Sequence, residues 1–388
     1  MTAVGTRRVA FFVTVDWYFC HHYLALAQAV RAAGFAVTVI TGVEDHGERI
    51  RAAGLDLIPL EVSRKGMHPW HELRSIARVT RILKDLKPVL LHNIAQKPVL
   101  YGTLAARLAG VPTVVNGVAG MGYLFSSDGP RARLVRGLVG GAYRALLAAP
   151  NVRVLVQNPD DQQQVRQLTG VEPVLIPGSG VDMTRFVPRP DPPGAVVVML
   201  ASRLLWDKGV GDFVSAARLL KALGSPARCV LVGKPDPGNP TSVAEEQLRD
   251  WHQEGCIEWW GHSADMPGVL AQAHIACLPS YYREGLPKFL IEAAAAGLPL
   301  VTTDATGCRE AVEVEGNGLL IPVHDPLALA HALERLIGDV DLRRRFGARS
   351  RMIAEARFDS ALIHAATLGV YRELLESKTA ASAAHERE

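Results

Sequence analysis

Residues 278–297, with the sequence LPSYYREGLPKFLIEAAAAG, decide the fold of the second half of the chain. An apolar strand is expected to end at the start of this stretch, and Pro287, a residue favoured in the first helical turn, then opens a helix that ends at Gly297. The loop between them places Glu284 and Gly285 at the helix N-terminus. Because backbone N–H groups and the helix dipole favour an anion there, the turn predicts a phosphate-binding site.

Two glutamates flank this helix start. Glu284 lies in the loop, and Glu292 lies eight residues later, inside the helix. A carboxylate does not itself bind a phosphate, so the pair indicates recognition of hydroxyl groups on a sugar or a ribose. Phosphate and hydroxyl recognition together predict a sugar nucleotide. The spacing alone also fits an ordinary strand-to-helix turn, because glycine and proline are common at such turns in α/β proteins.

Further residues around this turn form a denser pattern. They are Glu284-Gly285-x-Pro287, Glu292-Ala293, Gly297-x-Pro299, Thr303 and Gly307-x-x-Glu310. The set resembles the E-x7-E signature region of retaining glycosyltransferases of family 4. The resemblance implies an α/β protein of GT-B architecture, with two Rossmann-like doubly wound domains facing a central cleft. It also implies an enzyme that takes a sugar from a nucleotide diphosphate donor.

Composition is that of a globular protein. The chain has 388 residues, 48% hydrophobic and 21% charged, which is enough for two or three domains with cores of their own. A net charge of +3 gives no support for nucleic-acid binding. The five cysteines form no C-x-x-C pair, which favours a reducing cytoplasm and no structural metal. No apolar run reaches the roughly 18 residues of a membrane span, and the short apolar run near the N-terminus ends at Asp16, as in a buried first strand.

Short β-branched runs alternate with helical patterns and predict two parallel sheets, each with helices between its strands. In the first half, strands are expected at 8–15, 36–41, 88–92, 112–116 and 153–157, and helices at 21–33, 71–86, 97–109, 131–148 and 158–169. In the second half, strands are expected at 195–201, 228–233, 274–278, 298–302 and 318–322.

Prolines at 188, 190, 192 and 193 indicate a linker between two domains. The predicted domains are 1–187, an acceptor-binding domain, and 188–358, a nucleotide-sugar-binding domain. The C-terminal stretch 359–388, helical to about 375, is expected to return to the first domain, as the final helix does in the GT-B proteins that the chain resembles.

The stretch MLASRLLWDKG, residues 199–209, carries two cations between a strand and a helix. Arg203 can bind two phosphate oxygens and Lys208 adds a point charge, so together they could neutralise a diphosphate without a metal. Taken alone, such cations are commonly solvated. They match the arginine and the K-G lysine of the resembled family, which implies that they stabilise the leaving diphosphate as catalytic residues.

The resemblance also assigns roles near the helix start. Glu284 would orient the transferred sugar, Glu292 would bind the ribose, and the N–H groups of Gly285 and Leu286 would hold the diphosphate. Two loops that follow strands, at Gly233 and at His262, are further candidates for contacts to the base, although glycine there also fits a simple turn.

The acceptor is expected in the first domain. Its first strand ends at Asp16-Trp17-Tyr18-Phe19, with the next helix beginning at His21, where many family members have a glycine-rich turn. The bulk of these side chains suggests a ring-bearing or lipid-linked acceptor; a Trp at such an edge is also common in cores. His92, at the end of another strand, is a further acceptor-side candidate, although a lone histidine is usually structural.

Asn116 and Gly117 stand where relatives commonly have a histidine. The chain instead resembles a subgroup with the pattern N-G-x-x-G-x-G-Y, whose usual role is to add an N-acetylhexosamine or related sugar to a polyprenyl-diphosphate-linked or lipopolysaccharide saccharide. Asn116 is therefore included among the acceptor-side residues.

Residues 129–149 carry Arg131, Arg133 and Arg136 among leucines and valines. A basic amphipathic helix can lie on an anionic membrane surface or contact a diphosphate lipid, and it can also be an ordinary domain helix. The segment leaves a peripheral position at the inner face of the plasma membrane open for an otherwise cytoplasmic protein.

The sequence thus predicts a retaining glycosyltransferase that moves a hexose or N-acetylhexosamine from a nucleotide diphosphate sugar, UDP-linked by resemblance, to a lipid-linked or polysaccharide-precursor acceptor in bacterial glycan assembly. No cluster has metal-ligand spacing, so neither a metal nor a cofactor is expected, and the donor is a substrate. Two alternatives are a GT-B-shaped sugar-nucleotide epimerase and a non-catalytic sugar-nucleotide-binding partner in glycan assembly.

Overall fold

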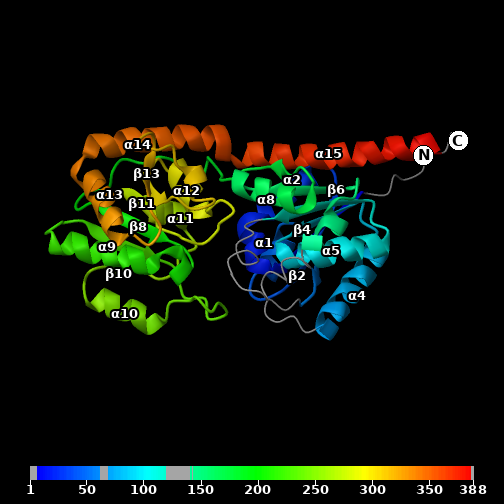
Figure 1. Ribbon diagram of the computed structural model, residues 1–388, viewed down its shortest axis with the longest axis horizontal. Helices are drawn as coiled ribbons and strands as arrows, with labels where there is room; N and C mark the ends of the chain where they lie inside the picture. Colours follow the sequence, from blue (N-terminus) through cyan, green and yellow to red (C-terminus); the bar gives the residue numbers. More distant parts are fainter. Residues whose placement is uncertain (1–6, 62–68, 119–139, 142, 386–388) are drawn as a thin grey trace. The chain divides into compact units, whose positions relative to one another are not determined.

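The computed structural model describes residues 7–61, 69–118, 140–141 and 143–385. The chain forms two compact units, one made of Met1–Ser179 with Ser360–Glu388 and the other of Gly180–Asp359 (Figure 1). We call them the N-terminal and C-terminal units. Both have helices on the two faces of a parallel sheet, as the alternating sequence pattern predicts, and the predicted α/β fold class is confirmed.

The N-terminal unit has a sheet with the order β3-β2-β1-β4-β5-β6-β7 in its described residues. The strands are β1 (Arg8–Val15), β2 (Ala36–Gly42), β3 (Asp56–Pro59), β4 (Leu90–Ile94), β5 (Thr113–Val118), β6 (Val152–Val156) and β7 (Val174–Leu175). Each pairs in parallel with its neighbour, and residues 9–13 of β1 are fully buried, which is why the strand is a continuous apolar run.

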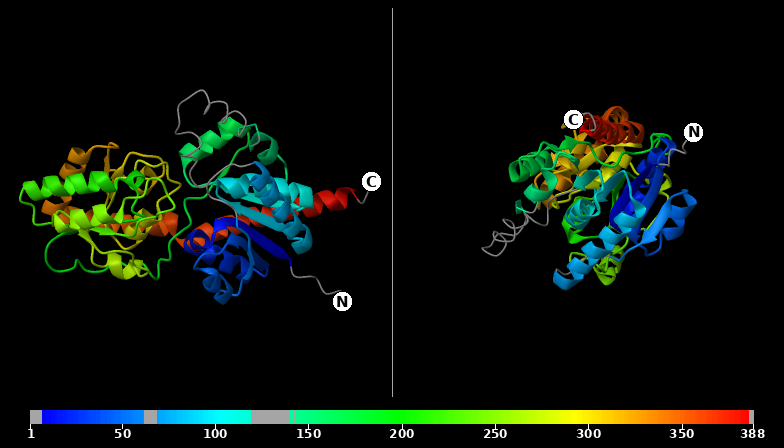
Figure 2. Two further views of the ribbon diagram at one scale, coloured as in Figure 1. Left: turned by 90° about the horizontal axis from the view of Figure 1, so that it is seen from below. Right: turned by 90° about the vertical axis from the view of Figure 1, so that its right-hand side faces the viewer.

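Helices cover both faces of this sheet. In the described part of this unit they include α1 (Asp16–His22), α2 (Leu24–Ala32), α3 (Gly47–Ala52), α4 (Pro69–Leu86), α5 (Gln96–Ala109), α8 (Pro159–Thr169) and α15 (Ser360–His385). One core contains Leu26 of α2 and Tyr371 of α15, and the other contains Leu83 of α4 and Val99 of α5. The red C-terminal helix in Figure 2 therefore belongs to the unit that begins the chain.

The C-terminal unit has the sheet order β10-β9-β8-β11-β12-β13. Its strands are β8 (Val197–Ala201), β9 (Arg228–Val232), β10 (Glu258–Trp259), β11 (Ile275–Leu278), β12 (Leu300–Thr303) and β13 (Gly318–Ile321). Its helices are α9 (Val210–Ala222), α10 (Glu245–Gln253), α11 (Met266–Leu270), α12 (Lys288–Ala295), α13 (Pro326–Gly338) and α14 (Val340–Ile353), with short helical turns at Trp206–Lys208, Arg309–Ala311 and Ala354–Phe358.

Every strand predicted from the sequence is present. The edge strands β3 and β7 were not predicted, because they are short and their residues are half-buried or exposed. One prediction about the first strand end is wrong: Asp16 begins α1 directly, rather than ending an extended segment before a helix at His21. The predicted helix at 131–148 lies largely outside the described residues.

The division between the units falls between Ser179 and Gly180, before the proline-rich segment that was expected to mark it. Val181 forms a parallel bridge with Asp359, and Phe186 packs in the core of the C-terminal unit, so the residues before the prolines already belong to that unit. Within the described residues, no helix has both the length and the apolar character needed to cross a membrane.

Candidate active site

The C-terminal unit reverses its strand order between β8 and β11, which are neighbours in the centre of the sheet. Ligands of open α/β sheets bind outside the carboxyl ends of the strands at such a reversal. The loops that leave these two strand ends are residues 202–209 and 279–287, and they contain the cations and the glutamate selected from the sequence.

Backbone contacts hold the two loops together. The carbonyl oxygen of Asp207 accepts hydrogen bonds from the N–H groups of Tyr281 and Tyr282, each at 3.1 Å. Gly209 has φ +72°, and a Cβ built on it would lie 1.9 Å from the carbonyl oxygen of Pro279. Only glycine fits at this position, for conformational and for steric reasons.

The side chains of Lys208 and Glu284 meet where these loops join. Lys208 Nζ forms an ion pair with Glu284 Oε1, and the two side chains are 14% and 11% exposed. The hydroxyl of Ser280 lies 3.1 Å from the same carboxylate oxygen. A cation, a carboxylate and a hydroxyl are thus placed within reach of one ligand at the carboxyl edge of the sheet.

A third loop, after β12, supports the Glu284 turn. The N–H of Glu284 donates to the carbonyl oxygen of Thr306 at 3.2 Å. Gly307 has φ +80°, and a Cβ there would lie 2.4 Å from the carbonyl oxygen of Gly285. The glycine in the sequence motif is therefore explained by close backbone packing against the turn.

Arg203 lies in the same region but has a different carboxylate partner. Its guanidinium donates to Asp236 Oδ2 at 2.8 Å, in the loop that follows β9. Tyr282 lies within electrostatic range of both Arg203 and Glu284, and burial raises its pKa above the ordinary value. Tyr282 and Ser280 belong to the quoted stretch and could have been selected from it, whereas Asp236 has no local signal because its pairing with Arg203 is long-range.

Helix α12 carries the second glutamate. Glu292 is 7% exposed, and its burial raises the pKa of its carboxyl to about 7, although the nearby cations Lys288 and Arg185 oppose this shift. Pro287 directly precedes the helix, and Gly297 takes a left-handed conformation just after it, as predicted. A buried carboxyl that titrates near neutral pH is a common property of functional sites.

The two candidates for contacts to the base differ in their surroundings. The N–H of Gly233 donates to the carbonyl oxygen of Gly261 at 2.7 Å, and its own carbonyl oxygen accepts from Trp259 Nε1 at 2.9 Å. Both backbone groups of Gly233 therefore have protein partners. His262 is exposed in the loop after β10 and is open to a ligand.

In the N-terminal unit, Asp16 is fully buried and its carboxylate binds three backbone N–H groups. Oδ1 accepts from Trp17 at 2.8 Å, and Oδ2 accepts from Glu44 at 2.9 Å and His46 at 2.7 Å. The carboxylate thus connects the start of α1 to the loop after β2. Trp17 is half-buried and packs edge-on against Tyr18, with ring centroids 5.6 Å apart.

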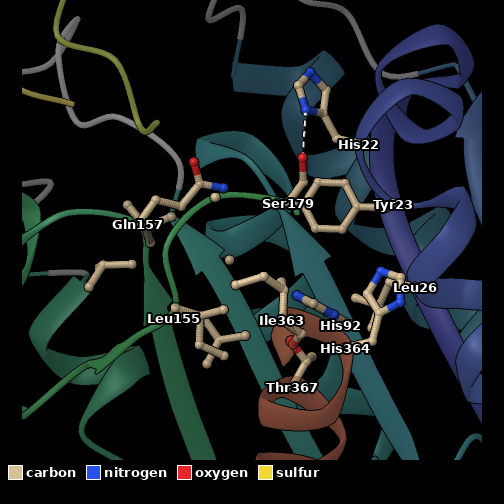
Figure 3. A pocket seen from close by; sticks show the side chains of 15 residues that line it. His22, Tyr23, Leu26, His92, Leu155, Gln157, Ser179, Ile363, His364 and Thr367 are labelled. Carbon is tan, nitrogen blue, oxygen red and sulfur yellow. Dashed lines mark hydrogen bonds between the residues drawn. The ribbon is translucent and has the colours of Figure 1, made fainter. Parts of the chain in front are cut away.

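His92 lies in β4 and lines a small cavity of the N-terminal unit (Figure 3). It is 1% exposed, and its Nδ1 lies 2.6 Å from the hydroxyl of Tyr371 in α15. Among the described residues its Nε2 has no hydrogen-bond partner. Burial lowers the pKa of His92 to about 3, so the ring is neutral at physiological pH.

Asn116 lies on the opposite face of the same sheet from His92. In the register of β4 and β5, His92 pairs with Val115 and Asn93 pairs with Asn116, so neighbouring positions point to opposite faces. Asn116 is fully buried and accepts hydrogen bonds from Asn93 and Thr103, at 2.9 and 3.0 Å. The structure therefore does not bring Asn116 and His92 together.

Arg131, Arg133 and Arg136 lie outside the described residues. Gly285 and Leu286 follow Glu284 in the turn before α12. Within the described parts of the chain, no group of histidine, cysteine and acidic side chains has an arrangement that could hold a metal ion.

Two Rossmann-like units, one of them with a cation and a carboxylate at its strand-order reversal, are the features of a glycosyltransferase of the GT-B class. Residues 8–151 match the family model described as glycosyl transferase 4-like, and residues 195–339 match the model described as glycosyl transferases group 1. The chain belongs to this glycosyltransferase family, as its motifs predicted.

Two bacterial enzymes are among the similar sequences. The N,N'-diacetylbacillosaminyl-diphospho-undecaprenol alpha-1,3-N-acetylgalactosaminyltransferase of Campylobacter jejuni is 26% identical over 92% of this chain and 96% of that enzyme. The UDP-Gal:alpha-D-GlcNAc-diphosphoundecaprenol alpha-1,3-galactosyltransferase of Escherichia coli is 26% identical over 69% of this chain and 71% of that enzyme.

Solved structures share the fold. A glycosyltransferase from Rickettsia africae superposes with a TM-score of 0.77 at 16% identity, covering 96% of this chain and 99% of that one. Anabaena HepE in complex with UDP and glucose superposes with a TM-score of 0.76 at 18% identity, covering 94% and 99%. At this identity the likeness supports the fold alone.

Proposed function

We propose that this glycosyltransferase transfers a hexose or N-acetylhexosamine from a UDP-sugar to a polyprenyl-diphosphate-linked or polysaccharide-precursor saccharide, with retention of anomeric configuration and without a metal. The observation that carries the proposal is the buried pair of Lys208 and Glu284 at the strand-order reversal of the C-terminal unit. It supplies a cation for a diphosphate and a carboxylate for sugar hydroxyls from two loops that are already held together.

The donor diphosphate would be bound by Lys208 and Arg203, with the N–H groups of Gly285 and Leu286 at the start of α12. Both cations already have carboxylate partners, Glu284 and Asp236, so each side chain would share or exchange a carboxylate for phosphate oxygens on binding. Stabilising the charge that develops on the leaving diphosphate is the main catalytic contribution proposed for these groups.

The two glutamates would have separate tasks. Glu284 would orient the transferred sugar through its hydroxyls, and Glu292 would accept hydrogen bonds from the ribose. Attack by the acceptor on the face from which the diphosphate leaves would keep the anomeric configuration. Retention is proposed from the motif pattern around the two glutamates.

The acceptor class is proposed from the relatives. The names of the two bacterial enzymes described above both refer to a saccharide linked to undecaprenol through a diphosphate. The Campylobacter jejuni enzyme aligns with this chain over nearly its whole length. The acceptor would bind to the N-terminal unit, with Trp17 and the basic residues at 131–136 as candidate contacts. We propose that the enzyme works in the cytoplasm, since its five cysteines are all free and buried, and at an anionic membrane surface.

The test is incubation of the protein with UDP-sugars, with and without an undecaprenyl-diphosphate-linked saccharide, in the presence and absence of EDTA. The expected result is an acceptor-dependent product with the donor's anomeric configuration and no loss of rate with EDTA. Product formed without acceptor would indicate an epimerase. Donor binding without any product would indicate a non-catalytic partner.

A further inference from the structure

The C-terminal unit contains a second cavity, at the amino ends of its strands. Its volume is about 430 Å³, which is in the range of small-molecule sites. His274, which directly precedes β11, and Pro299, which directly precedes β12, both line it. The cavity is therefore at the edge of the sheet opposite to the pair of Lys208 and Glu284, which follows the carboxyl ends of β8 and β11.

The lining is strongly basic. Five arginines contribute to it: Arg185, Arg189, Arg343, Arg344 and Arg351. Among the described residues that line the cavity, Asp191 is the one acid, and it lies 3.8 Å from Arg344. Prolines and aliphatic side chains, among them Pro188 and Leu270, form the rest of the wall. The cavity thus offers positive charge beside apolar surface.

Arg343 is the most buried of these arginines. It is 9% exposed, and its Nη1 donates to the carbonyl oxygens of Leu336 and Ile337 at 2.7 and 2.9 Å, at the end of α13. Its Nε is buried without a partner in the described part of the chain, and no described carboxylate pairs with it. A buried cation without a counter-ion is costly, so an anion in the cavity would stabilise this side chain.

The wall of the cavity is already ordered. His274 Nδ1 accepts from the N–H of Val197 at 3.0 Å, so its Nε2 carries the proton and donates to the carbonyl oxygen of Pro192, also at 3.0 Å. Burial lowers the pKa of His274, in agreement with a neutral ring. These bonds hold Pro192 beside the start of β11, and the prolines at 188, 190 and 192 restrict the backbone that leads to it.

Residues 186–188 are also close-packed against two glycines of the unit and Arg351. A Cβ on Gly297 would lie 3.1 Å from Cβ of Pro188, and a Cβ on Gly347 would lie 2.2 Å from the carbonyl oxygen of Gly297. Arg351 adds hydrogen bonds to the carbonyl oxygens of Phe186 and Ala295, at 2.6 and 2.8 Å. The residues around the cavity are therefore held by tight backbone contacts.

We propose that this cavity is a second ligand site, separate from the donor site, and that it binds a small phosphorylated molecule with a ring, such as a sugar phosphate. The arginines supply charge-assisted hydrogen bonds for the phosphate, and the prolines and aliphatic side chains supply a surface for the ring. The proposal stands on the cavity alone and is independent of the donor and acceptor proposed above.

The experiment is isothermal titration of the full chain with glucose 1-phosphate, with and without saturating UDP, and with glucose and inorganic phosphate as reference probes. The test variant is the double change Arg189→Gln and Arg344→Gln, because both side chains are exposed and Arg343, which also holds the end of α13, stays intact. The matched control is Arg218→Gln with Arg249→Gln, two exposed arginines that do not line the cavity.

We expect glucose 1-phosphate to bind with one site per chain in the presence of UDP, more tightly than phosphate, with no binding of glucose. The test variant should weaken this binding at least about tenfold, and the control should keep the parental affinity. Three results would overturn the proposal: no saturable binding up to about 10 mM, equal losses in both double variants, or displacement of the probe by UDP. If the chain does not bind UDP, that result counts against the proposed donor. The titration with glucose 1-phosphate then still tests the second site.

Discussion

Lys208 and Glu284 form an ion pair although 76 residues separate them in the sequence. Lys208 follows β8, Glu284 follows β11, and the two strands are direct neighbours in the sheet. The pair is largely buried, and Ser280 lies beside the same carboxylate oxygen. A substitution of Lys208 or of Glu284 therefore also removes a contact of the other residue.

Replacing Lys208 with Ala should remove the cation that faces the donor diphosphate. We expect kcat/KM to fall by roughly 10- to 150-fold, corresponding to about 1.5–3 kcal/mol for a charge-assisted hydrogen bond, and the Kd of UDP to rise. Arg249→Ala, at an exposed ion pair on α10, is the control and should change neither value. An unchanged kcat/KM in Lys208→Ala would remove Lys208 from the proposed mechanism.

Glu284→Gln should have a different effect, because the amide keeps the size of the side chain and loses its charge. We expect turnover to fall by at least about tenfold, since the proposed partner of Glu284 is the transferred sugar. UDP binding should not weaken, because the change removes the carboxylate with which the diphosphate would compete for Lys208. Turnover and the Kd of UDP should be measured on the same preparation of the variant, so that the two changes can be compared directly. A loss of UDP affinity as large as the loss of turnover would place Glu284 at the nucleotide instead.

Gly209→Ala should separate the two loops that carry the site. The new Cβ would lie 1.9 Å from the carbonyl oxygen of Pro279, so the loops must move apart. We expect UDP binding to be lost or weakened by at least about tenfold. Gly224→Ala is the matched control, since Gly224 has a similar φ of +77° with no atom within 4 Å of its Cβ position. Equal UDP affinities in the two variants would contradict the steric explanation.

The pKa of Glu292, about 7, predicts a pH dependence of donor binding. Ribose hydroxyls donate to the ionised carboxylate, so UDP should bind about five- to tenfold more tightly at pH 8 than at pH 6. The terminal phosphate of UDP also titrates, near about pH 6. The quantity to compare is therefore the change in UDP affinity between pH 6 and pH 8, measured for the parent and for Glu292→Gln. The affinity of Glu292→Gln should vary less with pH. Parallel pH profiles would exclude Glu292 as the titrating group.

The same group predicts a stability change of defined sign. Because its folded pKa is raised, the folded state binds more protons than the unfolded state between pH 4.5 and about 7, and stability falls as pH rises through that window. This carboxyl should lower the free energy of unfolding by roughly 3 kcal/mol at most across that pH range, as measured by urea unfolding. Its contribution should be absent in Glu292→Gln. A parent and variant with the same pH dependence of unfolding would contradict the burial of this carboxyl.

Tyr371→Phe should weaken the attachment of α15 to the N-terminal unit. It removes the hydroxyl 2.6 Å from His92 Nδ1 and leaves that buried nitrogen without its partner. We expect a destabilisation of about 1–3 kcal/mol in urea unfolding. UDP affinity should stay unchanged, because the residues proposed to bind the donor are in the other unit. Parental stability in this variant would mean that the contact contributes nothing to holding α15.

Replacing Arg131, Arg133 and Arg136 together with Gln tests the proposed membrane surface. Each basic residue near an anionic bilayer contributes about 1 kcal/mol, so the variant should pellet poorly with vesicles containing anionic lipid and should transfer slowly to a lipid-linked acceptor. Raised salt should reproduce the effect in the parent, and UDP affinity should be retained. Parental cosedimentation and transfer would indicate an ordinary domain segment.

The sequence by itself determined the long buried strands, the α12 turn and the family. Continuous apolar runs such as residues 8–15 predict buried parallel strands, and Pro287 and Gly297 mark the limits of α12, because these signals act through neighbouring residues. Arg203, Lys208 and the two glutamates were selected on the same local basis, with the resemblance adding their proposed roles.

Only the tertiary structure decided which of the selected residues meet. It placed Lys208 against Glu284, gave Arg203 the unpredicted partner Asp236, and put His92 and Asn116 on opposite faces of one sheet. The order of strands in a sheet and the register between them result from packing between residues far apart in the chain. Local sequence patterns do not carry that information, because strands that are neighbours in the sheet are joined through helices and loops of varied length.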